Sequence, residues 1–231
     1  MQTGSSPRTS ALRTLPGRLS TKQWPFAYPA TNPSFSTSAW MASRTLSTPT
    51  PTVSTTATAP SPAPLTFIFG DAAAVFQNCK MIVRKPMANQ GCMVTAQGRK
   101  ERRSTGATVL QNCHIMAEPA FLSTVPPLKA YLGRPWKEFS RTIIMQSLID
   151  GFIAPEGWSV WQGTFALDTL YYGEFKNRGP GSDMSRRVRW KGIQTITPAI
   201  AESFTPARLF AGDQWVTQSG IPYVPGMIPN V

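Results

Sequence analysis

The residue types that could do acid–base or nucleophilic chemistry are few in this chain of 231 residues. His114 is the only histidine, so a zinc hydrolase site of the usual kind is excluded and a Ser-His-Asp triad would depend on that one residue. Neither a GxSxG nucleophile elbow nor a P-loop occurs in the sequence. We therefore expect His114 to be a solvent or packing residue, and acid–base catalysis would have to come from carboxylates.

The most specific stretch of the sequence is KAYLGRPWKEFSRTIIMQS, residues 129–147. Arg134 offers a guanidinium fork that matches a carboxylate, and Trp136 offers an aromatic plate for a sugar ring. The same GRPW motif could also form a tight turn without any ligand. Taken by itself, the motif leaves both interpretations open.

Charge and cysteine content narrow the class of protein. The net charge of +12 and the pI near 10.2 predict attraction to a polyanion, which could be nucleic acid, anionic lipid or an acidic polysaccharide. Basic residues are scattered except at 98–103 and 185–191, and no zinc-finger spacing or RNP-type motif indicates nucleic acid. Three cysteines are too few for a disulfide scaffold and lack metal-ligand spacing, but they could form one bridge and leave one thiol.

Targeting signals are not visible in the sequence. No apolar run reaches the roughly 20 residues of a membrane span, and the N-terminus lacks the apolar core of a signal peptide. Taken literally, the sequence offers no route to secretion, and we expect no membrane partner.

Composition divides the chain in two. Residues 1–70 contain no Asp or Glu and are rich in Ser, Thr, Pro and Ala, and 45–64 has the composition of a disordered linker. Beyond this segment, short strand-like runs recur without helical periodicity, which predicts an all-β region. VFQNCKMIV (75–83) and VLQNCHIMA (109–117) align with a 34-residue offset, which favours the stacked coils of a parallel β-helix over a sandwich.

The later motifs together resemble plant pectinesterases (pectin methylesterases). They are FIFGDAAAVFQNC, RKPMANQGCMVTAQGR, YLGRPWKEFSRTIIMQS, GWSVWQGTFALDTLYYGEFKNRGPGS and RVRWKGIQTIT, in family order from about Thr66 to about Met227. The resemblance implies a right-handed parallel β-helix and hydrolysis of methyl esters of homogalacturonan, without metal or cofactor, in the cell wall outside the cell. It also implies a monomer, with pectin as substrate and a proteinaceous pectinesterase inhibitor as a further partner.

Site residues carry over from this family only in part. Its members use two aspartates, one as nucleophile and one as general acid and base, with glutamines stabilising the oxyanion. The family arginine that holds the nucleophile falls on Arg134, and the tryptophan of the sugar subsite falls on Trp136. The resemblance also implies that Cys79 and Cys113 pair, leaving Cys92 unpaired.

Thr66 is the most consequential departure from the family pattern. The family has GTVDFIFG where this chain has PAPLTFIFG, so the aspartate position holds Thr66. The upstream motifs QAVALR and GFQDTL, which carry the other aspartate and the glutamines, are absent. We therefore expect a pectinesterase-family protein of weak or no activity, or alternatively a catalytically inactive basic protein that binds pectin or another polyanion.

A shifted reading frame explains the foreign composition of the first 65 residues. When codons are formed from the third base of one residue and the first two of the next, Trp40 and Met41 must give Asp, and Met41 and Ala42 must give Gly. The following junctions permit FQDTL, and the same operation permits QAVALR over 21–27 and GTVD over 62–66. We therefore expect 1–65 to be a disordered or out-of-frame segment, and 66–231 to be an N-terminally incomplete β-helix domain of pectin-lyase type.

Overall fold

The computed structural model describes residues 38–42, 54–55, 66–86, 91–210, 223–229 and 231. All of them belong to one unit, Asn32–Val231, and a first unit, Met1–Thr31, lies outside the described residues.

The chain repeats one pattern of three short strands, each followed by a turn. Successive coils are built from β3 (Thr66–Gly70), β4 (Ala73–Gln77) and β5 (Lys80–Val83), then β6 (Cys92–Gln97), β7 (Ala107–Gln111) and β8 (His114–Ala117), then β9 (Ala130–Gly133), β10 (Arg141–Met145) and β11 (Leu148–Ile149), and finally β12 (Tyr171–Phe175) and β13 (Ile193–Thr195). Short helical turns lie at α1 (Pro119–Leu122), η1 (Pro180–Ser182), α2 (Pro198–Ser203) and α3 (Pro206–Phe210).

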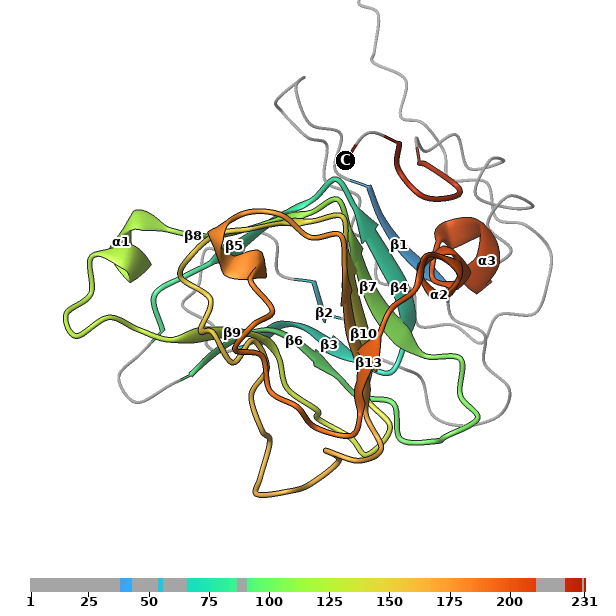
Figure 1. Ribbon diagram of the computed structural model, residues 1–231, viewed down its shortest axis with the longest axis horizontal. Helices are drawn as coiled ribbons and strands as arrows, with labels where there is room; N and C mark the ends of the chain where they lie inside the picture. Colours follow the sequence, from blue (N-terminus) through green and yellow to red (C-terminus); the bar gives the residue numbers. More distant parts are fainter. Residues whose placement is uncertain (1–37, 43–53, 56–65, 87–90, 211–222, 230) are drawn as a thin grey trace, which may run out of the picture. The chain divides into compact units, whose positions relative to one another are not determined.

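Equivalent strands of successive coils pair in parallel and form three sheets (Figure 1). We call them sheet A (β1-β4-β7-β10-β12-β13), sheet B (β2-β3-β6-β9) and sheet C (β11-β8-β5). The register keeps like residues together, because Val75 pairs with Val109 and Val109 with Ile143. The prediction of an all-β parallel β-helix, right-handed as crossover connections between parallel strands are, is confirmed.

Two strands precede the first coil. β1 (Ser38–Ala42) pairs with β4, and β2 (Ser54–Thr55) pairs with β3, and both pairings are antiparallel. The rest of 1–65 lies outside the described residues. The prediction that 1–65 is disordered or out of frame therefore stays a prediction.

The turn from sheet A to sheet C has the same backbone conformation in four coils. Asn78, Asn112, Gln146 and Lys176 occupy equivalent positions, with φ between 48° and 55°. Asparagine tolerates this left-handed region better than most residues. The Asn112 side chain also donates to Asn78 Oδ1 at 2.7 Å, so the QNC repeat seen in the sequence ties adjacent coils together.

Two apolar clusters stabilise the coils. The first lies between the three sheets and includes Leu110, Ile115 and Leu132, each fully buried. The second lies on the other face of sheet A, where residues from α2 and the C-terminal segment, including Phe204, pack against Val109. In Figure 1, α2 and α3 lie beside β4. Full burial of one such side chain is worth about 1.5–3 kcal/mol.

A glutamine ladder attaches the C-terminal segment to sheet A. Gln77 Nε2 donates to Gln111 Oε1 at 2.7 Å, and Gln111 Nε2 donates to Gln146 Oε1 at 3.1 Å. The three amides also bind backbone groups of residues 224, 226 and 228, at 2.6–3.1 Å. Each buried amide therefore has partners in an adjacent coil and in the C-terminal segment, as buried polar groups require.

No helix in the described part of the chain is long and apolar enough to cross a membrane.

Candidate functional site

The loop that follows β9 carries Arg134 and Trp136. The Arg134 backbone N–H donates to Thr95 O at 3.1 Å, which continues the pairing of sheet B. Gly133, just before it, packs so closely that an added Cβ would lie 2.2 Å from Thr95 Oγ1 and 3.2 Å from the Trp158 ring. Glycine at this position therefore lets the end of β9 pack closely against Thr95 and Trp158.

Trp136 forms a half-buried plate at the edge of sheet B. Its ring meets Phe69 edge-on, with centroids 6.2 Å apart and an interplanar angle of 85°. A Cβ on Gly98 would lie 2.7 Å from the ring, so glycine is required beneath it. The Lys137 Nζ lies 5.3 Å from the ring centroid. This arrangement gives a fixed aromatic surface with a cation at its border, which suits an anionic sugar.

Arg134 stacks on a second tryptophan. Its Cζ lies 4.4 Å from the centroid of the Trp161 ring, and 38% of Trp161 is exposed. The Arg134 Nε is buried and has no hydrogen-bond partner among the described residues. Burial lowers the pKa of Arg134 below its usual value. A buried donor without an acceptor costs about 1–3 kcal/mol, and an oxygen ligand at this position would remove that cost.

No described carboxylate forms an ion pair with Arg134. The ion pairs among the described residues are His114–Asp150 and Arg187–Glu174. Thr66, where the resemblance leads us to expect an aspartate, begins β3 and pairs with Met93 of β6, which pairs in turn with Tyr131 of β9. Thr66 and the strand before Arg134 therefore belong to one sheet, two strands and about 10 Å apart.

A buried polar cluster lies next to Trp136. The Oε1 of Gln97 accepts from the backbone N–H groups of Arg99 and Arg141, both at 2.9 Å, and its Nε2 donates to Asp71 at 3.4 Å. Burial raises the pKa of Asp71, although the bond from Gln97 opposes this shift. Burial and the neighbouring Arg141 lower the pKa of Arg99 to about 10. Gln97 thus links its own coil to the coil before it and the coil after it, next to the Trp136 ring.

His114 lies away from this loop, on sheet C. Its Nε2 is 2.9 Å from Asp150 Oδ1, and both side chains are about one-third exposed. Neither residue belongs to the turns that carry Arg134 and Trp136. The position agrees with the expectation of a solvent or packing histidine.

Cys79 and Cys113 lie on adjacent coils. The His114 backbone N–H donates to Cys79 O at 2.9 Å, and the residues after the two cysteines, Lys80 and His114, pair in register. Neighbouring strands are about 4.8 Å apart, within the usual Cα separation of a disulfide. Burial and the adjacent Cys79 raise the pKa of Cys113. The bridge itself stays a prediction.

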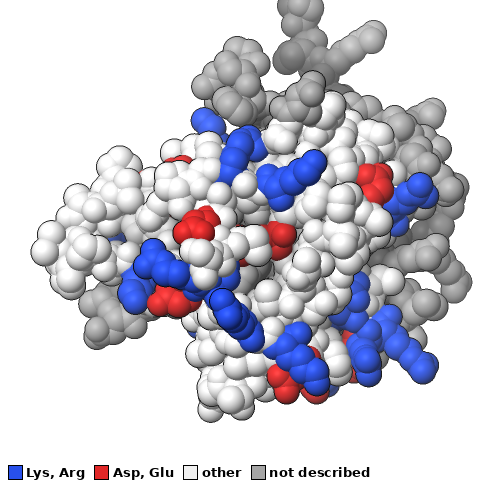
Figure 2. Space-filling model, viewed as in Figure 1, with Lys and Arg blue, Asp and Glu red and all other residues white. Residues whose placement is uncertain are grey.

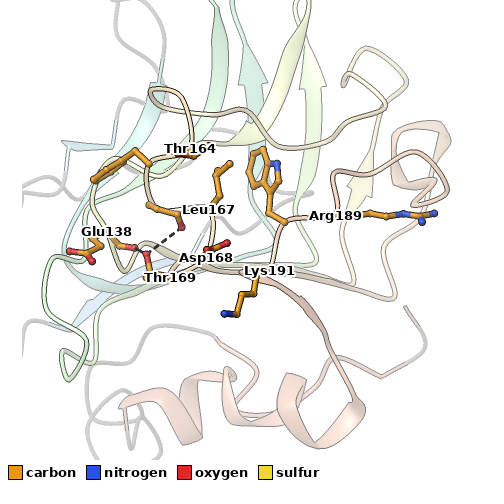
Figure 3. A pocket seen from close by; sticks show the side chains of 10 residues that line it. Glu138, Thr164, Leu167, Asp168, Thr169, Arg189 and Lys191 are labelled. Carbon is orange, nitrogen blue, oxygen red and sulfur yellow. Dashed lines mark hydrogen bonds between the residues drawn. The ribbon is translucent and has the colours of Figure 1, made fainter.

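A cavity of about 640 Å³ lies next to the continuation of the loop at Glu138 (Figure 3). Residues 164–169 and 189–191 line it together with Glu138, which follows Trp136 by two positions. Neither Arg134 nor Trp136 lines it. In Figure 3 the Arg189 side chain extends away from the other labelled residues. Among the described residues, no group of three or more His, Cys, Asp or Glu could hold a metal ion.

Sequence reasoning placed Arg134 and Trp136 in one loop, as the structure has them. It missed Trp161 and Phe69, which complete the aromatic surroundings, and the Gln97 cluster. Both aromatic residues lie in motifs that were visible, FIFG and GWSVWQG. Only the stacking of the coils shows that these motifs meet at Arg134 and Trp136.

Known proteins are similar to this chain in sequence and in fold. A family model described as Pectinesterase matches residues 63–213. "Probable pectinesterase/pectinesterase inhibitor 58" of Arabidopsis thaliana is 55% identical over 158 residues, which are 68% of this chain and 28% of that protein. "Pectinesterase" of Petunia integrifolia is 54% identical over 165 residues, covering 70% of this chain and 44% of that protein.

Two solved structures of pectin methylesterases have a similar fold. The pectin methylesterase from carrot superposes with a TM-score of 0.69 at 45% identity, over 71% of this chain and 52% of that one. The pectin methylesterase from Aspergillus niger superposes with a TM-score of 0.52 at 28% identity. The match covers 65% of this chain and 46% of that one. The chain therefore spans between about a quarter and a half of the length of these relatives. Since the family model matches well over half of its residues, the chain belongs to the pectinesterase family.

Proposed function

We propose that this chain descends from an enzyme that hydrolyses methyl esters of homogalacturonan to pectate and methanol. The observation that carries the proposal is the loop after β9. There Arg134 stacks on Trp161, its buried Nε has no partner among the described residues, and Trp136 offers an aromatic plate. A guanidinium in this state would hold a carboxylate, and the plate would hold a sugar ring. Membership of the pectinesterase family supports this assignment.

We further propose that the chain, with the sequence given, turns pectin over weakly or not at all. In the mechanism carried over from the family, one carboxylate attacks the ester carbonyl carbon. A second carboxylic acid protonates the departing methanol, and water then hydrolyses the acyl-enzyme. Thr66 stands at the first of these positions. A threonine hydroxyl is a weak nucleophile without an adjacent base, and the sole histidine is paired with Asp150 on another sheet.

The coding DNA tests the origin of this loss. If 1–65 is out of frame, the DNA will spell QAVALR, DGFQDTL and GTVD across 21–27, 40–47 and 62–66, and the frame-repaired protein will release methanol from highly methylated pectin. A different DNA sequence at those positions would contradict the frame hypothesis. The beginning of the family match, at residue 63, supports a join near Thr66.

The second candidate function is a basic, catalytically inactive protein that binds pectin. It is favoured by Arg134 and Trp136, whose arrangement persists without a described catalytic carboxylate, and by the net charge of +12. Under both candidates we propose an extracellular wall location, a monomer, and homogalacturonan as partner. The names of several relatives, which join pectinesterase and pectinesterase inhibitor, support an inhibitor protein as a further partner.

A further inference from the structure

An exposed basic turn follows β6. Lys100, Arg102 and Arg103 are all exposed there, with one acid, Glu101, between them. Figure 2 shows Lys and Arg side chains gathering at the lower right of the view, where the turn after β6 lies in Figure 1. Neither of the ion pairs among the described residues involves these three cations.

Arg99 holds this turn against the loop of Trp136. Its Nη1 donates to Phe139 O at 3.2 Å, and its Nη2 donates to Arg102 O. The Phe139 N–H donates back to Arg99 O at 3.1 Å. The Lys100 backbone also hydrogen-bonds to Asp71. The basic turn is therefore fixed beside the loop of Trp136 instead of extending freely into solvent.

The Trp136 loop adds a fourth cation to this surface. Lys137 is exposed and lies beside the Trp136 ring. We call Lys100, Arg102, Arg103 and Lys137 the basic rim. Two exposed carboxylates are sequence neighbours of its members: Glu101 lies between Lys100 and Arg102, and Glu138 follows Lys137. The rim thus carries separated positive charges instead of one continuous positive strip.

We propose that the basic rim binds the free carboxylates of galacturonate residues next to the sugar held at Arg134 and Trp136. This inference rests on the proposed function and extends it, because it assigns a preference for stretches of pectin that already carry free acid groups. A polyuronate carries one charge per sugar, which suits separated cations. Duplex DNA carries one charge per about 1.7 Å, a much denser row of charges than cations interrupted by Glu101 and Glu138 would match.

Binding of the full chain to unmethylated polygalacturonate tests the proposal. One variant carries Lys100→Ser, Arg102→Ser and Arg103→Ser. A matched control, Lys85→Ser, Lys176→Asn and Arg208→Ser, removes the same charge from exposed positions on other elements, with asparagine at the left-handed Lys176 position. Melting curves of both variants establish that the fold is kept.

We expect the rim variant to lose about tenfold in affinity for polygalacturonate and the control to lose less than twofold, since three exposed charge contacts are each worth a fraction of a decade. Affinity for highly methylated pectin should change little in either variant. Equal losses in the two variants would overturn the proposal, because net charge would then explain the binding. Duplex DNA that binds as tightly as polygalacturonate at matched ionic strength, and that the rim variant also loses, would overturn it in favour of a general polyanion surface.

The proposed function fails on a different measurement. A frame-repaired protein that releases no methanol would remove the esterase assignment but leave the binding results as they stand. If the repaired protein releases methanol but the rim variant keeps its affinity for polygalacturonate, only the proposed role of the basic rim would be refuted.

Discussion

At the level of one residue, Arg134 carries the proposed binding role although no described carboxylate forms an ion pair with it. Its guanidinium is partly buried against Trp161, and its Nε has no acceptor among the described residues. Such a donor costs stability, whereas an apolar group of similar shape would not. A position that lowers stability but suits an oxygen ligand is typical of a functional site.

Replacing Arg134 should have opposite effects on the stability of the fold and on pectin binding. Arg134→Met should leave the melting temperature unchanged or raise it, because it removes a desolvated donor that has no partner among the described residues. It should also lower pectin retention about tenfold, the value of one charge-assisted contact. Arg134→Lys is the control: it keeps the charge but loses the fork, so retention should be intermediate. A large fall in melting temperature for Arg134→Met would show that the residue is structural.

The cysteines predict a second outcome at the residue scale. After folding under oxidising conditions, Cys79 and Cys113 should be bridged and Cys92 should remain a thiol. Burial raises the pKa of Cys92 to about 11, so alkylation at neutral pH should be slow. The bridge should add roughly 3–4 kcal/mol to the free energy of unfolding. Peptide mapping without reduction checks the pairing, and a bridge that contains Cys92 would contradict it.

At the element scale, the repeated coil could be predicted and its attachments could not. The QNC repeat marks the same turn in two coils because asparagine suits the left-handed backbone there, so local chemistry was visible in the sequence. The glutamine ladder was not visible, since Gln77 and residue 224 meet only after folding. The contact of Arg134 with Trp161 and the antiparallel pairing of β1 likewise depend on tertiary packing.

One buried ion pair fastens the later turns to sheet A. Arg187 binds Glu174 of β12 through Nε at 2.8 Å and Nη2 at 3.0 Å, and also binds the carbonyls of Pro155 and Gly181. Gly157, with φ of 70°, leaves the space that the Arg187 side chain occupies. Both charged side chains are almost fully buried.

Breaking this pair should be costly. Glu174→Gln should lower the free energy of unfolding by about 3–5 kcal/mol, because it leaves the Arg187 charge buried without its counter-ion. Glu138→Gln, at an exposed position, is the matched control and should change it by less than about 0.5 kcal/mol. Denaturant titration measures both. Similar small effects in the two variants would show that the pair does not hold the turns together.

At the scale of the whole molecule, the chain combines a family domain with a segment of different composition. Matches to the family begin at residue 63, and the coils begin at β3. We predict that limited proteolysis cuts within 1–65 well before it cuts within the coils of 91–210. Mass spectrometry of early fragments checks this order. Equal protection of both parts would contradict the predicted boundary at residue 65.

Methanol release from highly methylated pectin tests the proposed loss of esterase activity most directly. It is measured for three proteins: the chain with the sequence given, its Thr66→Asp variant, and the frame-repaired protein. We predict no turnover above background for the first and almost none for the second, because restoring one member of a cooperating catalytic set recovers little rate. The third should be faster by several orders of magnitude. Robust turnover by the first protein would contradict the proposed loss of activity, because it would show that hydrolysis does not need the two family aspartates.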